Sequence, residues 1–188
     1  LFYLMTTWIL SFAIGGEDTG GLGYGYQAFL VLQVIAILLF AAFIPIAGYL
    51  ADRFGRRKML IATTVGIILF GLSFGWWLSP EAMGTGENLD VGRMLVFLCV
   101  GMALMGLTFG PMSAVLPELF PTNTRYTGSG VAYNISAILG AALTPFAAVW
   151  LVQHFSVAHV GYYLAAMSVL TIISLVLAPE TSKKSLYT

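Results

Sequence analysis

A short charged segment separates two long apolar runs of the chain, and it reads Gly48-Tyr49-Leu50-Ala51-Asp52-Arg53-Phe54-Gly55-Arg56-Arg57-Lys58. Gly48 permits the end of one helix to approach a neighbour closely, and Gly55 permits a tight reversal with positive φ. Asp52 can accept hydrogen bonds from the free N–H groups of a nearby helix N-terminus. Arg56 and Arg57 can form forked pairs with carboxylates of other loops. Four basic residues alone would indicate only a positively charged loop, but the added glycines and the aspartate favour a gate element.

The composition indicates that lipid is the natural solvent of this chain. Of its 188 residues, 59% are hydrophobic and only 9% are charged, whereas soluble domains carry about 25% charged residues. The formal net charge is zero, which argues against a nucleic-acid surface. Cys99 is the single cysteine, so no disulfide forms within the chain. His154 and His159 stand alone, so neither a metal nor any other cofactor is expected.

Apolar periodicity predicts an all-α membrane protein with six transmembrane helices, because about 20 apolar residues cross the hydrocarbon core. The six segments are Leu1–Ile14, Gln27–Leu50, Lys58–Leu78, Arg93–Leu116, Thr127–Val152 and Val160–Ala178. The first is too short to span the bilayer by itself, and we expect its beginning to lie upstream of Leu1. Two pairs, Gly71 with Gly75 and Gly106 with Gly110, have the Gly-x-x-x-Gly spacing that predicts close helix packing.

The basic residues predict the orientation in the membrane, since cytoplasmic loops are enriched in lysine and arginine. With six crossings, seven of the eight basic residues fall on one side, and they are Arg53, Arg56, Arg57, Lys58, Arg125, Lys183 and Lys184. Arg93 is the exception, at the outer end of the fourth helix, where it can reach lipid headgroups. We therefore expect a multi-pass protein with a cytoplasmic C-terminus.

Two stretches of the chain resemble known transporters. The pattern Gly48-x-Leu50-Ala51-Asp52-Arg53-x-Gly55-Arg56-Arg57 resembles the loop signature of the major facilitator superfamily. The run from Pro117 to Gly128, which includes Glu118, Phe120-Pro121-Thr122 and Arg125-Tyr126-Thr127, is similar to the corresponding loop of the metabolite:proton symporter family. That family includes α-ketoglutarate, shikimate, citrate and proline/betaine transporters. Tyr133-Asn134 through Gly140 and Pro145, and later Pro179-Glu180-Thr181, continue the likeness.

The resemblance covers essentially the whole chain and implies the C-terminal half of the fold, helices seven to twelve. It implies two three-helix repeats, at about 1–79 and 93–178, and a cytoplasmic tail at 179–188. The function that it implies is secondary transport of a small metabolite, an organic acid or an osmolyte, by proton symport and alternating access in a bacterial inner membrane. The implied partners are the substrate, a proton, the lipid bilayer and the missing N-terminal half.

The resemblance also assigns roles to residues. It implies a cytoplasmic charge network that holds the two halves together in the outward-facing state, and its members are Gly48, Asp52, Arg53, Gly55, Arg56, Arg57, Glu118, Arg125 and Glu180. Polar or aromatic side chains within cavity-lining helices are costly in lipid and are therefore substrate candidates, and they are Gln33, Asn134, Tyr133, Tyr26, Thr108 and Trp8. For Gln33 and Asn134, hydrogen bonding between helices is an equal alternative. For Thr108, a bond to its own helix is the favoured reading.

No Asp, Glu, Lys, Arg or His lies deep within the six segments. A proton-coupled carrier needs a titratable group in the membrane, so we expect the other half to supply it. A sugar porter or drug exporter of the same superfamily is the alternative function. A six-helix membrane enzyme is remote, because Ser129 and Ser136 have no His or Asp partner within the apolar segments. A complete six-helix protein acting as a homodimer is a further alternative.

Replacing Asp52 or Arg56 with alanine is expected to abolish most transport while membrane insertion remains intact, because both belong to the gate element. Uptake of radiolabelled substrate measures the effect. Wild-type uptake rates in both variants would contradict the gating role.

Overall fold

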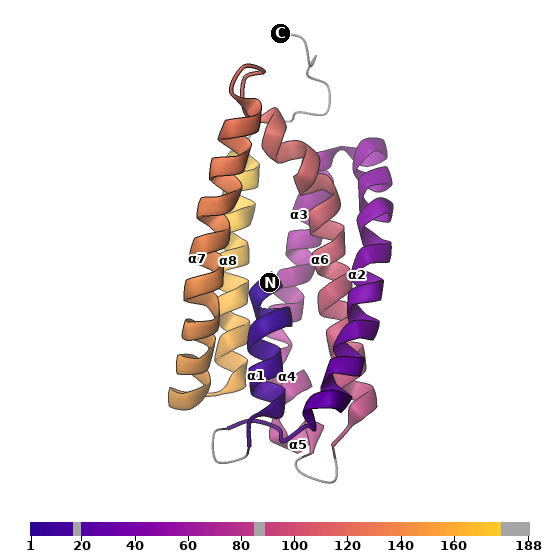
Figure 1. Ribbon diagram of the computed structural model, residues 1–188, viewed down its shortest axis with the longest axis vertical. Coiled ribbons are helices and arrows are strands. Elements are labelled where there is room, and N and C mark those ends of the chain that lie inside the picture. Colours follow the sequence, from indigo (N-terminus) through magenta and orange to yellow (C-terminus); the bar gives the residue numbers. More distant parts are fainter. Residues whose placement is uncertain (17–19, 85–88, 178–188) are drawn as a thin grey trace.

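The computed structural model describes residues 1–16, 20–84 and 89–177, and all regular structure within them is helical (Figure 1). The elements are η1 (Leu4–Trp8, a π-helical turn), α1 (Ile9–Ile14), α2 (Tyr26–Phe54), α3 (Arg56–Leu72), α4 (Phe74–Leu78), α5 (Pro80–Met83), α6 (Val91–Glu118), α7 (Arg125–His154) and α8 (Val157–Leu177).

Four of these helices are long and apolar enough to cross a membrane, namely α2, α6, α7 and α8. The all-α membrane class is therefore confirmed, whereas the expected count of six complete spans is not. The first predicted segment is represented by η1 and α1, which together remain shorter than a span. Ala178, the predicted end of the last segment, lies outside the described residues.

The third predicted segment, Lys58–Leu78, is not one continuous helix. It divides at Ser73 into α3 and α4. The Ser73 hydroxyl donates to the Phe70 carbonyl at 2.7 Å, a local bond that competes with regular helical pairing. The short helix α5 follows in a stretch that the sequence predicts to be loop.

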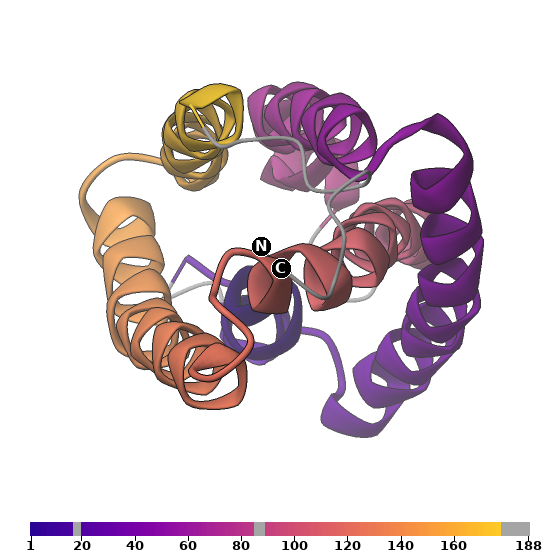
Figure 2. The same cartoon turned by 90° about the horizontal axis from the view of Figure 1, so that it is seen from above.

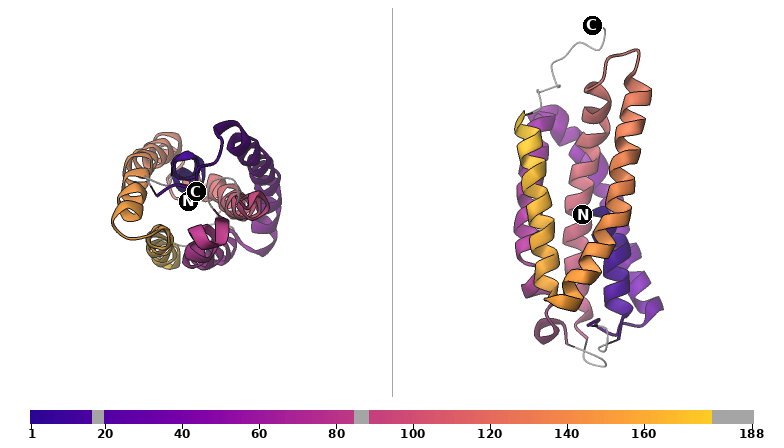
Figure 3. Two further views of the ribbon diagram at one scale, coloured as in Figure 1. Left: turned by 90° about the horizontal axis from the view of Figure 1, so that it is seen from below. Right: turned by 90° about the vertical axis from the view of Figure 1, so that its left-hand side faces the viewer.

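The long helices alternate in direction, so that their connections gather at two ends of an elongated bundle. The α2–α3 and α6–α7 connections and the last turn of α8 lie at one end (Figure 1). The connections from α1 to α2 and from α7 to α8 lie at the other. Seen from above, α1 lies between α7 on one side and α2 on the other (Figure 2). The view from below gives the same order, and the side view shows α7 and α8 running together along the bundle (Figure 3).

Glycine contacts hold the helices together. A Cβ on Gly106 would lie 2.7 Å from the Phe40 carbonyl oxygen, and one on Gly110 would lie 2.6 Å from that of Ile44, so α6 packs directly on the backbone of α2. A Cβ on Gly71 would likewise lie 2.7 Å from the Gly161 carbonyl oxygen of α8. Close packing at both Gly-x-x-x-Gly pairs is therefore confirmed. In lipid this matters because helix association depends on such van der Waals contact rather than on a hydrophobic driving force.

An aromatic core fills the end of the bundle opposite the charged loop. Phe74 is fully buried, and its ring centroid lies 5.2 Å from that of Phe70 and 5.1 Å from that of Phe97. Trp8 stacks on this group, 6.4 Å from Phe74. These contacts join η1, α3, α4 and α6 into one unit.

Replacing Gly110 with alanine is expected to destabilise the protein, by about 1–3 kcal/mol, because the added methyl group must push α6 away from α2. The matched control is Gly130→Ala on α7, where a Cβ would meet no atom within 4 Å. Thermal unfolding of the purified full-length protein in detergent measures both. Equal midpoints for the two variants would contradict this packing.

Candidate functional site

The charged loop makes a tight reversal at Gly55. This residue has a φ of 98° and separates the last residue of α2 from the first residue of α3. L-residues with a side chain rarely adopt such a φ, so the reason predicted for Gly55 is confirmed. Gly48 is different, because a Cβ there would meet no atom within 4 Å. Within this chain the close helix approach belongs to Gly110, whose added Cβ would lie 2.9 Å from the Gly48 backbone nitrogen.

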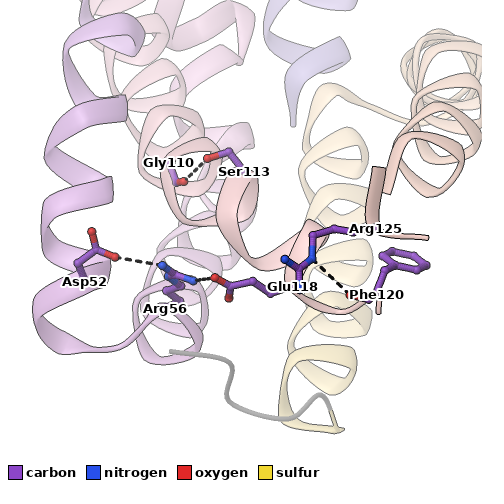
Figure 4. Close-up of polar contacts among 7 residues, drawn as sticks. All are labelled: Asp52, Arg56, Gly110, Ser113, Glu118, Phe120 and Arg125. Carbon is purple, nitrogen blue, oxygen red and sulfur yellow. Dashed lines mark hydrogen bonds and ion pairs between the residues drawn. The ribbon is translucent and has the colours of Figure 1, made fainter. Parts of the chain in front are cut away.

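Arg56 is the centre of an ion-pair cluster (Figure 4). Its guanidinium pairs with Glu118 at the end of α6 and lies 3.4 Å from the Asp52 carboxylate of α2. The Arg56 and Glu118 side chains are only 20% and 16% exposed, whereas Asp52 is 73% exposed. The cluster therefore has a half-buried pair at its centre and one carboxylate at its rim. Asp52 was expected to accept from a helix N-terminus, but within the described part of the chain its partner is Arg56.

Helix electrostatics explain why the pairing of Arg56 with Glu118 is favourable. Arg56 begins α3 and Glu118 ends α6, so each charge lies at the helix end where the macrodipole disfavours it. Pairing offsets both penalties. The hydrogen bond to Glu118 raises the pKa of the Arg56 guanidinium above its ordinary value.

The structure does not bring all the predicted network residues together. The Arg125 Nε donates to the Phe120 carbonyl at 3.5 Å, and in the described residues Arg125 makes no ion pair. Arg57 donates to the Val176 carbonyl at the end of α8. The Arg53 guanidinium lies 5.5 Å from the centre of the Phe54 ring. Glu180 lies outside the described residues.

A groove of about 780 Å³ lies between the second half of α6 and the first half of α7, toward the end of the bundle that holds the charged loop (Figure 1). Tyr133 and Asn134 both line it, and the Asn134 amide donates to the Gly130 carbonyl at 2.8 Å. The remaining lining residues are Phe109, Met112, Ser113, Leu116, Pro117, Tyr126, Thr127, Ser129, Gly130, Val131, Ile135 and Ile138. No lining residue carries a charge, so the groove suits an uncharged or locally neutral part of a ligand.

The other four substrate candidates lie away from this groove. Gln33 is 6% exposed and bonds to backbone carbonyls of η1. Thr108 donates to the Leu104 carbonyl of its own helix at 2.9 Å, which agrees with the favoured reading. Tyr26 is exposed at the start of α2. Trp8 belongs to the aromatic core and lines a smaller cavity of about 180 Å³ between α1 and α7.

The sequence analysis missed the α6 wall of the groove. Phe109, Met112, Ser113 and Leu116 have the i, i+3, i+4, i+7 spacing of one helix face. That spacing was visible in the sequence, but the whole helix is apolar, so it did not indicate which face lines a groove. At the other end of the bundle, the sequence also missed that Arg93 lies 4.3 Å from the centre of the Trp76 ring.

Comparison with known proteins identifies relatives over nearly all of the chain. Residues 6–188 match the family model described as sugar (and other) transporter. The chain is 45% identical over 186 residues to the inner membrane metabolite transport protein YhjE of Escherichia coli K12, covering 99% of this chain and 40% of that protein. It is 32% identical to the proline/betaine transporter of the same organism, covering 83% of this chain and 30% of that protein.

A third relative, the shikimate transporter of Escherichia coli K12, is 27% identical over 81% of this chain and 33% of its own length. The chain thus spans about two fifths or less of the length of these relatives. No solved structure matches the chain significantly.

A double-mutant cycle tests the geometry of the cluster. Arg56→Gln and Glu118→Gln are expected to show a coupling energy of about 0.5–3 kcal/mol, as groups in direct contact do. The matched cycle of Arg125→Gln with Glu118→Gln is expected to show coupling near zero. Thermal stability of the purified full-length variants measures both. Strong coupling to Arg125 with none to Arg56 would contradict the arrangement in Figure 4.

Proposed function

We propose that this chain, which belongs to the sugar (and other) transporter family of the major facilitator superfamily, is half of a secondary transporter that moves a small metabolite by alternating access. The observation that carries the proposal is the uncharged groove between α6 and α7, beside a charged loop at one end of the bundle. The relatives are named as transporters of metabolites, of proline and betaine and of shikimate. Transport rather than covalent chemistry is the activity that fits this family.

The proposed topology has six crossings, helices seven to twelve of the complete protein. In it, η1 with α1 forms the outer part of the first crossing, and α3 with α4 forms the third. The proposed three-helix repeats are about 1–79 and 93–178. The gathering of the α2–α3 and α6–α7 connections at one end of the bundle supports this topology (Figure 1). Because Arg53, Arg57 and Arg125 belong to that end, we infer that it is cytoplasmic.

The ion-pair cluster suggests a refined gating role. Arg56 and Glu118 both belong to this chain, so their pair joins the start of α3 to the end of α6. The pair fixes the position of the charged loop, and Asp52 stands exposed at its rim. We propose that the loop, through Asp52 and the open side of Gly48, contacts the missing half in the outward-facing state. An isolated surface pair contributes only about 0–1 kcal/mol, which suits a contact that must form and break during each cycle.

The groove also constrains the substrate. Its polar groups are hydroxyls and the Asn134 amide, with no charged side chain among the lining residues. An organic acid or a zwitterionic osmolyte therefore needs a charged partner from the other half, and the titratable group for proton symport must come from there too. In this proposal the present chain contributes the uncharged contacts of the binding site, and the other half contributes the charged groups.

Uptake into proteoliposomes that contain the full-length protein tests the function. With an inward proton gradient, one member of a panel of proline, glycine betaine, shikimate and α-ketoglutarate is expected to accumulate. Dissipating the gradient is expected to abolish accumulation. Absence of uptake of every compound, with the protein correctly inserted, would contradict a role in metabolite:proton symport.

Replacing Tyr133 with leucine is expected to raise the KM for that substrate by about tenfold, through the loss of a groove contact worth about 1.4 kcal/mol. The matched control is Tyr162→Leu on α8, since Tyr133 and Tyr162 are 53% and 50% exposed but only Tyr133 lines the groove. Substrate-dependent initial rates measure both variants. The same change in KM for both variants would contradict substrate binding in the groove.

A further inference from the structure

The first helix contains a π-helical turn, η1, of which Leu4, Met5 and Trp8 are buried. The Ile9 N–H bonds to the Leu4 carbonyl, five residues back. In a regular α-helix this N–H would bond to the Met5 carbonyl, four residues back. The turn therefore takes away the usual partner of the Met5 carbonyl. It lies about halfway along the bundle, near the N-terminus marked in Figure 1.

Gln33 of α2 supplies the replacement. Its side-chain amide nitrogen donates to the Met5 carbonyl at 3.2 Å and to the Thr6 carbonyl at 2.9 Å. Its side chain is almost completely buried. At membrane depth, irregular backbone is tolerated where other groups satisfy its polar atoms. Gln33 thus satisfies two carbonyls of a turn that differs from a regular helix.

The turn also determines which face of α1 is directed toward α7. Trp8 at its end, and Ser11 and Phe12 beyond it, line the cavity of about 180 Å³ together with Val152 and Gln153 of α7. Rewinding the π turn into an α-helix would remove one residue from the turn, and one residue corresponds to about 100° of rotation. Such a change would turn a different face of α1 toward α7 and reshape this cavity. Single π turns recur at functional sites and at helix kinks.

We propose that Gln33 is a positioning residue that holds η1 in its π-helical form, and that release of its two hydrogen bonds lets the first helix change winding during the transport cycle. The movement opens and closes the cavity between α1 and α7. This proposal rests on the proposed transport function for its role in the cycle. The hinge itself is a property of the fold and can be measured without any substrate.

Hydrogen–deuterium exchange of the full-length protein in lipid nanodiscs tests the hinge. Gln33→Met keeps the length of the side chain but removes both donors, so the amides of Leu4–Ile9 are expected to exchange at least about tenfold faster. The matched control is Thr108→Val, which removes a hydroxyl that bonds only within its own helix. It is expected to leave the exchange of Leu4–Ile9 unchanged. Unchanged exchange in Gln33→Met would overturn the proposal.

Transport kinetics separate this role from direct substrate binding. For a positioning residue, Gln33→Met is expected to change kcat by about tenfold while KM stays within about twofold. A raised KM with unchanged kcat would overturn the proposal and make Gln33 a substrate ligand. If the protein transports none of the compounds tested, the exchange result still decides the hinge, so failure of the function and failure of the hinge are distinguishable.

Two further measurements keep the proposal testable if Gln33→Met does not fold. Gln33→Asn retains an amide but is too short to reach both carbonyls, and it is expected to speed exchange of Leu4–Ile9 in the same way. In the wild-type protein, these amides are expected to exchange faster than those of Met102–Thr108 on α6. Equal protection of the two segments would overturn the proposal.

Discussion

The close approach of α6 to α2 at Gly106 and Gly110 is the contact on which the rest of the arrangement depends. Without side chains at these two positions, the α6 surface reaches the carbonyl oxygens of Phe40 and Ile44. Lipid gives no hydrophobic driving force for helix pairing, so van der Waals contact between the two backbones at these glycines contributes much of the free energy of association. It also sets the relative height of the two helices. The end of α6 therefore meets the α2–α3 connection, and Glu118 comes within reach of Arg56.

The ion pair follows from this packing and gives the charged loop a fixed position. Arg56 and Glu118 lie at helix ends that disfavour their charges, and each relieves the other. The groove between α6 and α7 opens beside this pair. One end of the bundle thus combines a partly exposed charge cluster with an uncharged groove wall, while the aromatic core at Phe74 and Phe97 holds the other end together. An end built in this way suits the proposed gate, whose contacts form and break during the transport cycle.

Local patterns in the sequence predicted the long helices and the reversal between α2 and α3. They did not predict the contacts between residues that are far apart in the sequence. Length and apolarity predicted α2, α6, α7 and α8, and the need for positive φ predicted the reversal at Gly55. The sequence analysis did not predict the break at Ser73 or the π turn at Leu4–Trp8. Each depends on particular hydrogen bonds, and the spacing of apolar residues gives no information about them. The resemblance placed Glu118, Arg56 and Arg125 in one charge network without deciding which arginine pairs with Glu118. The structure pairs Glu118 with Arg56, which is 62 residues away in sequence, because the packing of α6 on α2 and α3 brings these two helix ends together.

The proposed function requires that the α6–α7 groove opens to the cytoplasm beside the charged loop, whose position the Arg56–Glu118 pair fixes. Ser113 lines the groove and is exposed, so we would measure the alkylation rate of Ser113→Cys in the full-length protein, with all its native cysteines, Cys99 among them, replaced by alanine. Reaction with a membrane-impermeant maleimide is compared in inside-out and right-side-out vesicles. We expect modification from the cytoplasmic side only, and a severalfold faster rate when Glu118 is also replaced by glutamine. Modification from the outer side, or an alkylation rate that does not change in the Glu118→Gln variant, would contradict this arrangement.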